Sequence, residues 1–302
     1  MRNSHALQEV NFVHPQLHRN VDLQPYEKAL KEARYLTFPL EEMLELLYQL
    51  NEFEFGRSLL VNRGLTGYWR AYTIMYAPYM NLKHPLENWM INEAPLSLAV
   101  RETFAIFQTE IQKRLKDNMA LSAVPCGLMD TLLSLDYKNI SNIRLIGIDS
   151  DAETINYAKQ NVAKHGFRGA VSFHQKDLWN LGEFEKYDFI VNHGLNIYEH
   201  DDQKVILLYK GFHKALHSNG ILIISFFTPS PTLSDESTWK NFDPKALQKQ
   251  KAILKEILNI KWQAFRTEEQ TKSHLEEAGF SIVDVIYDSQ GMAPTIVARK
   301  QD

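Results

Sequence analysis

The spacing of hydrophobic and polar positions changes character near residue 118. Before it, apolar side chains recur at three- and four-residue steps, from Leu40 to Leu50 after Pro39 and again over residues 96–115. This period is typical of amphipathic helices, and proline is favoured in a first helical turn. Residues 1–37 are polar and weakly patterned, so we expect an extended arm or a short helix there. The N-terminal third is therefore predicted to be helical.

After residue 118, apolar runs of strand length alternate with segments of helical spacing. Helices are expected over residues 151–165, which end at Gly166, and over residues 202–217. Near-continuous apolar strands suit a parallel sheet that is buried on both faces. This alternation predicts a doubly wound α/β sheet. The expected strands are residues 119–124, 143–148, 170–173, 187–191 and 220–227.

The C-terminal part ends in a pattern of its own. Residues 228–242 contain prolines and serines and are expected to form a loop, which a helix over residues 243–265 follows. Thr267-Glu-Glu-Gln270 is typical of a capping box, and its helix is expected to end at Gly279. Two last strands, residues 280–287 and 292–299, are separated by Asp-Ser-Gln-Gly, which fits a hairpin.

Composition then narrows the class of protein. The 302 residues are 44% hydrophobic and 23% charged, as is usual for a soluble globular protein. The 33 Lys and Arg against 37 Asp and Glu, without a long basic run, disfavour a dedicated nucleic-acid binder. No apolar run approaches the roughly 20 residues that span a bilayer, and no secretory signal is visible, so a cytoplasmic location is expected. Cys126, the one cysteine, excludes an internal disulfide and a multi-cysteine metal site.

Candidate chemistry follows the predicted strand ends. A tight turn around Gly127 comes after the first strand, where glycine lets the backbone approach a ligand closely. Asp149 ends the next strand, 22 residues after Gly127, a distance that suits a hydrogen bond to a ribose diol. Asp177 follows the third strand, and Asn192 and His193 follow the fourth. Taken singly, each acidic residue is more typical of a helix N-cap or a solvated turn than of a ligand contact.

Taken in order, these motifs resemble the class I S-adenosylmethionine-dependent methyltransferases over roughly residues 117–300. The resemblance rests on Pro125-Cys126-Gly127, Asp149, Asp177-Leu178, His193-Gly194-Leu195 and the hairpin ending. It implies a Rossmann-like doubly wound α/β fold whose seven-stranded, mostly parallel sheet has an antiparallel last strand. It also implies a helical N-terminal lid over residues 1–116, a methyltransferase domain over residues 117–302, and a cap insertion at residues 228–265.

The resemblance also implies site residues. S-adenosylmethionine is the expected cofactor, and its methionyl part is expected above the turn of residues 125–129. The other expected contacts are Asp149 with the ribose, Ser150, Asp177 and Leu178 with the adenine, and Asn192 and His193 near the sulfonium. Residues 64–72 are either a lid that brings Tyr68, Trp69 and Arg70 to the cofactor carboxylate, or a helical turn packed on the sheet domain. The expected cofactor-binding set is Tyr68, Pro125, Cys126, Gly127, Met129, Asp149, Ser150, Asp177, Leu178, Asn192 and His193.

The first motif departs from the family pattern of an acidic residue followed by three alternating glycines. Ala123 stands at the acidic position, and Pro125 and Met129 replace the first and third glycines. Asp130, the N-terminal lid or Asn192 are the candidates to replace the lost carboxylate. An NAD-dependent enzyme is disfavoured, because its cofactor loop typically has an intact Gly-x-Gly-x-x-Gly and only one of those glycines is present here.

The expected reaction is methyl transfer to a small molecule at oxygen or nitrogen. The activated methyl donor carries the chemistry, and the protein aligns the acceptor. His193 is a candidate general base or a hydrogen-bonded pocket wall, and Tyr198 either orients the acceptor or packs. Two alternatives stay open: a non-catalytic S-adenosylmethionine-binding regulator and an RNA methyltransferase. The sequence names neither the acceptor nor the oligomeric state, and no membrane partner or metal is expected.

Overall fold

The computed structural model describes residues 20–301, in which the chain forms two compact units from interleaved segments. Unit 1 comprises Met1–Leu65, Tyr72–Ser97 and Asp243–Lys261, and unit 2 comprises Thr66–Ala71, Leu98–Phe242 and Trp262–Asp302. The sequence pattern placed one boundary after residue 116, whereas the chain crosses between the units several times. Residues 1–19, part of the expected arm, lie outside the described residues.

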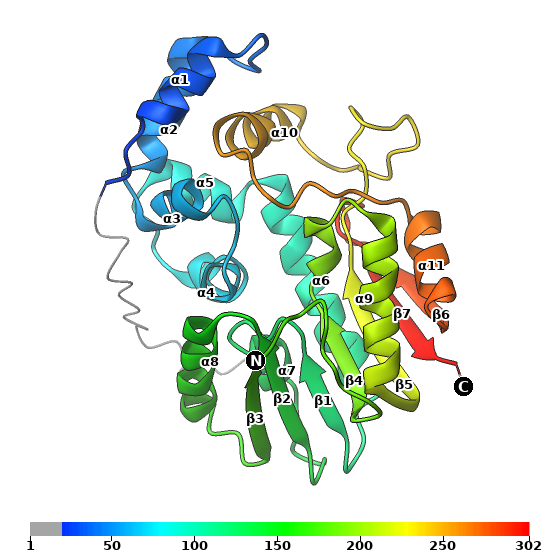
Figure 1. The fold of residues 1–302 in the computed structure, drawn as a ribbon. Helices are drawn as coiled ribbons and strands as arrows, with labels where there is room; N and C mark the ends of the chain where they lie inside the picture. Colours follow the sequence, from blue (N-terminus) through cyan, green and yellow to red (C-terminus); the bar gives the residue numbers. More distant parts are fainter. Residues whose placement is uncertain (1–19, 302) are drawn as a thin grey trace. The chain divides into compact units, whose positions relative to one another are not determined.

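Unit 2 contains a seven-stranded sheet in the order β3-β2-β1-β4-β5-β7-β6 (Figure 1). Neighbouring strands from β3 to β5 are parallel, whereas β7 runs antiparallel to both β5 and β6. The predicted Rossmann-like sheet with its inserted antiparallel last strand is therefore confirmed. The strands are β1 (Ala120–Ala123), β2 (Arg144–Asp149), β3 (Ala170–Gln175), β4 (Tyr187–Asn192), β5 (Leu216–Ser225), β6 (Phe280–Ile286) and β7 (Thr295–Lys300).

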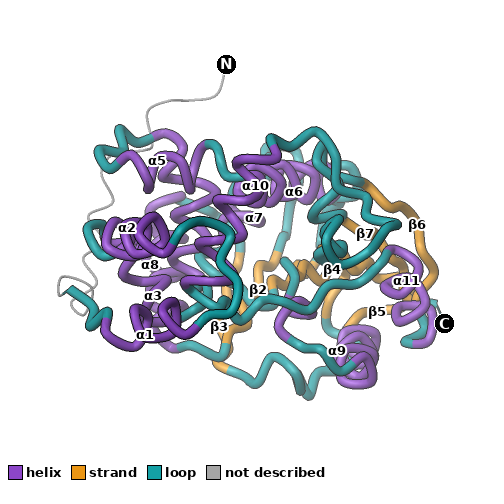
Figure 2. The backbone as a smooth tube through the Cα atoms, turned by 90° about the horizontal axis from the view of Figure 1, so that it is seen from above, coloured by secondary structure: helices purple, strands orange, loops and turns teal. Residues whose placement is uncertain are grey.

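Helices cover both faces of this sheet. On one face, α9 (Asp202–Ala215) and α11 (Glu268–Glu277) pack over one hydrophobic core. On the other, α7 (Asp130–Leu133), α8 (Ala152–His165) and the part of α6 (Pro95–Gln112) from Leu98 onward enclose a second core. Figure 2 shows α9 and α8 on opposite sides of the strands. Burial on both faces explains why the central strands are almost continuously apolar.

The ends of two helices follow the expected local signals. Gly166 ends α8 in the left-handed conformation, with a φ of 64°. Thr267 caps α11 through a hydrogen bond from the Gln270 N–H, and the Gln270 side chain accepts from the Thr267 N–H. The predicted capping box is confirmed, and it fixes where α11 begins after the preceding loop.

The long helix predicted over residues 243–265 is wrong in its second half. Helix α10 (Pro244–Lys251) continues into a π-helical segment, η4 (Ala252–Ile257), and helical structure stops there. Asn259 then adopts a left-handed φ of 44°, which redirects the chain. Beyond it, Phe265 pairs with Phe227 in a parallel bridge. This long-range pairing competes with local helical periodicity and holds the end of the segment extended.

Unit 1 is helical in its described part. Besides α10, η4 and the first residues of α6, it contains α1 (Gln24–Glu32), α2 (Leu40–Leu50), α3 (Glu54–Asn62), α5 (Pro85–Asn92) and the short segments η1 (Tyr72–Tyr76) and η2 (Ala77–Tyr79). The stripe of Met43, Leu47 and Leu50 on α2 is fully buried, as the three- and four-residue spacing predicted. Among residues 20–301, no helix combines the length and the apolar character needed to cross a bilayer.

The loop between β6 and β7 is organised by one buried carboxylate. Asp288 is 1% exposed, and its Oδ1 accepts from the N–H groups of Gln290 and Met292. Its Oδ2 accepts from the N–H of Ala293 at 2.7 Å. The predicted hairpin therefore closes through a wider loop, and β7 begins at Thr295 instead of residue 292.

We expect Asp288→Ala to lower the free energy of unfolding by about 3 kcal/mol, because three buried N–H groups lose a charged acceptor. Urea titration followed by circular dichroism measures this loss. Asp284, exposed on β6, supplies the control, and Asp284→Ala should change stability by less than about 0.5 kcal/mol. Equal losses in the two variants would contradict the assignment.

Candidate active site

The turn after β1 uses two left-handed residues to leave the sheet. Gly127 has a φ of 51° and Met129 a φ of 64°. Glycine adopts this conformation freely, whereas the Met129 backbone is held there although its side chain is buried in the core between the sheet and α8. Met129, which stands where the resemblance has its third glycine, therefore adopts a left-handed backbone without being a glycine.

Asp149, the last residue of β2, faces this turn. Its Oδ2 accepts from the Gly127 N–H at 3.3 Å, and its Oδ1 accepts from the Asp151 N–H at 3.2 Å. Burial raises the pKa of the carboxyl, although these two N–H groups and Arg70 lower it. The Oδ2 also accepts weakly from the Cys126 thiol at 3.8 Å. The Oδ1 has a further lone pair, so the group can accept from a diol while it holds the turn.

The short helix α4 (Gly67–Ala71) lies directly against the same turn. A Cβ at Gly67 would be 2.8 Å from the Gly127 Cα and 2.6 Å from the Thr154 Cγ2, so glycine is needed for this approach. Tyr68, expected to contact the cofactor, packs its ring on Tyr157 of α8 at 5.7 Å. Both sequence-based interpretations of this segment, lid and packed turn, place it here, and its role stays a prediction.

Arg70 brings a cation to the turn. A Cβ at Gly127 would lie 2.7 Å from the Arg70 Nη2, so the guanidinium rests against the turn's backbone. Burial lowers the pKa of Arg70, and the charges of Asp130 and Asp149 oppose that shift. The guanidinium remains protonated at physiological pH. It is placed to pair with an anionic group above residues 125–129.

The predicted adenine-side residues lie at the ends of β2 and β3. Asp177 is exposed, and its Oδ1 accepts from the Trp179 N–H at 2.9 Å. Leu178 packs in the core beneath α9, whereas Ser150 is exposed and accepts from the Gln175 side chain through its carbonyl. Their roles toward an adenine stay predictions.

Asn192 links two strand ends inside the protein. Its fully buried amide donates to the Val124 carbonyl at 2.7 Å and accepts from the Leu195 N–H at 3.0 Å. Both polar ends of the side chain therefore have protein partners. Its geometry suits fixing the turn after β4 relative to the turn after β1, and the predicted contact near the sulfonium stays a prediction.

His193 is held on three sides. Its Nε2 lies 2.7 Å from the Thr131 Oγ1, and its ring stacks on Phe107 at 4.0 Å and near Phe104 at 5.8 Å. Burial, reinforced by the charge of Arg70, lowers the pKa of His193 well below 6.5. The imidazole is therefore neutral at physiological pH, and the same shift lowers its basicity.

This pKa shift predicts a pH dependence of stability. The unfolded histidine binds a proton near pH 6.5 and the folded one does not, so stability is present above pH 6.5 and is lost as pH falls below it. The slope is at most about 1.4 kcal/mol per pH unit for one proton. Urea titrations between pH 5 and 7.5 should give a shallower slope for His193→Gln. His274, whose pKa burial also lowers, remains in both proteins. Identical slopes would contradict this account.

The sequence predicted the residues at the strand ends but not the residues that contact and hold them. Thr131, Phe107 and Asn161 stand out only in the fold, where Asn161 donates to the Leu128 carbonyl at 2.7 Å. Cys126 is buried, and burial raises its thiol pKa, which agrees with the quiet packing role that its sequence position indicated. Tyr198 is 39% exposed and contributes to the electrostatic surroundings of Arg70.

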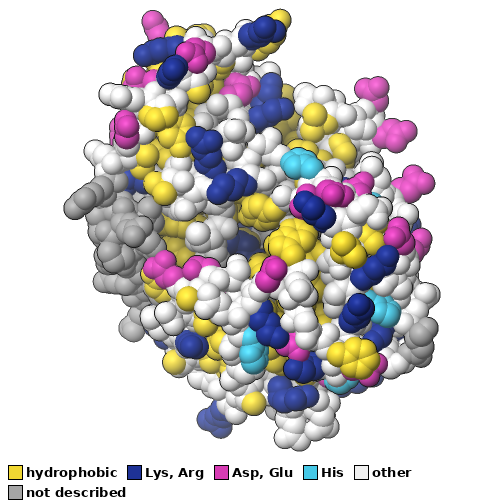
Figure 3. All heavy atoms as spheres, viewed as in Figure 1, with side chains coloured by type: hydrophobic (Ala, Val, Ile, Leu, Met, Phe, Trp, Pro, Cys, Tyr) yellow, Lys and Arg dark blue, Asp and Glu magenta, His cyan; other side chains and the backbone are white. Residues whose placement is uncertain are grey.

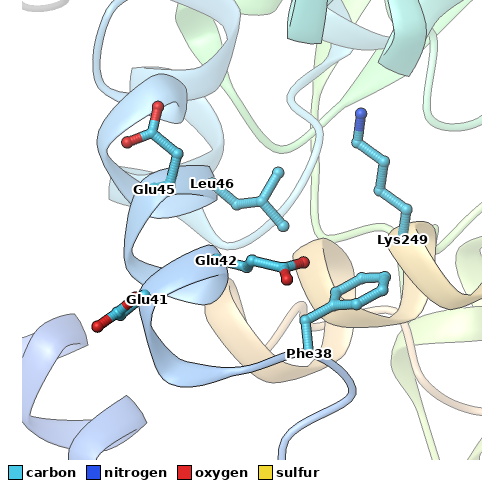
Figure 4. A pocket seen from close by; sticks show the side chains of 6 residues that line it. All are labelled: Phe38, Glu41, Glu42, Glu45, Leu46 and Lys249. Atoms are coloured by element: carbon cyan, nitrogen blue, oxygen red, sulfur yellow. The ribbon is translucent and has the colours of Figure 1, made fainter.

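A separate hollow of about 450 Å³ lies within unit 1, between α2 and α10 (Figure 4). Glu42 and Leu46 point from α2 toward α10, whereas Glu41 points away. Lys249 lies over the Trp89 ring at 4.4 Å, and burial lowers its pKa. None of the strand-end motifs lies in this hollow, so the strand-edge residues of unit 2 form the candidate active site.

Comparison with known proteins identifies the family of the chain. A family model described as a methyltransferase domain matches residues 109–279. A possible exported protein from Bordetella parapertussis is 36% identical over 92% of this chain and 93% of that one, with a TM-score of 0.88. A search of curated proteins found no match.

Two more distant structures share the fold. A putative O-methyltransferase from Nostoc punctiforme is 17% identical, with 73% of this chain and 62% of that chain aligned and a TM-score of 0.51. The [4+2]-cyclase SpnF is 15% identical, with 66% and 80% aligned and a TM-score of 0.50. With the family match and the ordered strand-end motifs, the chain belongs to the class I S-adenosylmethionine-dependent methyltransferases.

Proposed function

We propose that this enzyme methylates a small molecule at oxygen or nitrogen and binds S-adenosylmethionine at the carboxyl ends of β1, β2 and β4. The observation that carries this proposal is the convergence of Gly127, Asp149 and Arg70 on one turn. A turn that favours glycine, a buried carboxylate and a cation match a ligand with a sugar diol and a charged amino-acid end.

The residues present fit the cofactor. Asp149 has lone pairs for the ribose hydroxyls, and Arg70 suits the cofactor carboxylate. The carboxylate missing at Ala123 has a nearby substitute in Asp130, which is 7% exposed and acts electrostatically on Arg70. S-adenosylmethionine, when bound, supplies a methyl group already activated on a sulfonium.

The chain's own contribution is alignment, exclusion of water and proton transfer. His193 is neutral, and we propose that it accepts the proton of an oxygen or nitrogen acceptor. A role as pocket wall is the alternative, and its stacking on Phe107 supports that role. If His193→Ala keeps its cofactor affinity but loses turnover by at least about 100-fold, the result supports the role as general base. Unchanged turnover supports the role as pocket wall.

Charge distribution supports a small acceptor over RNA. Basic and acidic side chains are interspersed over the face drawn in Figure 3, and the net charge is −4. An RNA-binding face is instead rich in clustered Lys and Arg.

We also propose a cytoplasmic location. Fractionation of cells that express the tagged protein tests it, and recovery outside the cytoplasm would contradict it.

The deciding experiment joins binding to product detection. Calorimetry with S-adenosylmethionine and S-adenosylhomocysteine should show binding of both. Incubation with isotopically labelled S-adenosylmethionine and fractionated cell metabolites or bulk RNA should then place the label in small molecules. Label in RNA would overturn the acceptor class. Absence of cofactor binding would overturn the site.

A further inference from the structure

Arg266 is a buried cation that joins three segments of unit 2. It is 3% exposed, and its Nε donates to the Asp202 Oδ1 at 2.8 Å. Its Nη1 donates to the Asn196 carbonyl at 3.1 Å, and its Nη2 donates to the Glu199 carbonyl at 2.7 Å. One guanidinium therefore binds two backbone carbonyls in and just after the turn that follows β4, and the first residue of α9.

This arrangement depends on the shape of the guanidinium. Its planar fork supplies donors in different directions, whereas a lysine ammonium is a single point of charge on a flexible stem. Asp202 balances the buried charge, and the two carbonyl oxygens each accept from one of the terminal nitrogens.

The bound turn lies beside the candidate active site. The 3₁₀ turn η3 (Leu195–Tyr198) follows His193 and Gly194 directly, and Tyr198 contributes to the electrostatic surroundings of Arg70. The segment that carries Arg266 also holds this turn through its backbone, since the Ala264 N–H donates to the Ile197 carbonyl at 3.0 Å. The Arg266 N–H in turn donates to the Phe227 carbonyl, just after β5.

We propose that Arg266 is a positioning residue that holds η3, and with it Tyr198, in one orientation toward Arg70 and His193. Through it, the segment of residues 262–266 and the end of β5 determine the shape of the acceptor side of the site. The assignment of this turn to an acceptor side rests on the proposed function, whereas the ordering of the turn by Arg266 does not.

The test compares Arg266→Gln and Arg266→Lys with Asp288→Ala, which destabilises the same unit away from the turn. Amide hydrogen exchange reads the turn, because the Ile197 N–H bonds to the Gly194 carbonyl and the Glu199 N–H to the Asn196 carbonyl. We expect exchange at these two amides to rise about tenfold or more in Arg266→Gln, by less in Arg266→Lys, and hardly at all in Asp288→Ala. Arg266→Lys keeps the charge and serves if Arg266→Gln fails to fold.

A second readout separates positioning from general stability. With 3-fluorotyrosine at position 198, fluorine NMR should show one sharp resonance in the parent protein and in Asp288→Ala, and a shifted or broadened one in both Arg266 variants. Unchanged resonances and exchange equal to that of Asp288→Ala would overturn the proposal. S-adenosylhomocysteine is titrated into the same samples. Failure of the parent protein to bind it would overturn the proposed function alone, because the exchange comparison needs no ligand.

Discussion

Asp149→Ala is expected to weaken binding of S-adenosylmethionine and S-adenosylhomocysteine by about 100- to 1,000-fold. The carboxylate suits two charge-assisted hydrogen bonds to a diol, each worth about 1.5–3 kcal/mol. Their loss, with partial compensation by water, amounts to about 3–4 kcal/mol and thus to that change in dissociation constant. The Gly127 N–H also loses its acceptor, so the turn itself loosens. Calorimetry measures the affinity directly.

Asp151 provides the matched control, two residues further along. It caps α8 by accepting from the N–H groups of Glu153 and Thr154, both at 3.1 Å. Asp151→Ala should lower stability by about 1 kcal/mol and leave cofactor affinity nearly unchanged. Asp149→Asn keeps one acceptor oxygen for the Gly127 N–H and should lose less affinity than Asp149→Ala. An Asp149→Ala protein that binds like the parent would show that the ribose is held elsewhere.

The position of Asp149 was predictable because it depends on the local sequence, an apolar run followed directly by an acidic residue. A strand buried on both faces must be a continuous apolar run, so 143–148 predicts β2 to within a residue or two. The carboxylate that follows such a strand then falls at the edge where ligands bind. The same reasoning located β1 and β4. The sequence therefore predicted the sheet and the positions of its strand ends.

The supports of the site depend on contacts between distant residues, which periodicity does not encode. Asn192 bonds to a carbonyl 68 residues earlier, and Gly67 lies against Gly127. The helix expected to reach residue 265 ends at Ile257, because Phe265 pairs with Phe227 at the end of β5. Local helical spacing predicts a helix up to residue 265, and the pairing of two distant residues ends it earlier. The role of Arg266 likewise depends on its hydrogen bonds to the distant carbonyls of Asn196 and Glu199, which the sequence does not reveal.

Gly127→Ala is expected to weaken cofactor binding about tenfold or more while it costs only about 1 kcal/mol of stability. The stability loss comes from a side chain at a φ of 51°, where an L-residue is disfavoured by about 1–2 kcal/mol. The added Cβ would lie 2.7 Å from the Arg70 Nη2, and the flexible arginine moves aside at little cost in stability. The cation is then displaced from the turn, and this displacement weakens cofactor binding.

Gly166 separates the two effects, since it has a similar φ of 64° and no atom within 4 Å of its Cβ position. Gly166→Ala should lose about the same stability as Gly127→Ala in urea titrations and keep full cofactor affinity. Arg70→Ala should weaken cofactor binding on its own. Gly127→Ala should then cost less affinity in the Arg70→Ala background than in the parent protein, because the guanidinium that its Cβ would meet is absent. Additive losses in this double-mutant cycle would mean that the two residues act independently, and that the guanidinium on the turn does not mediate the effect of the methyl group.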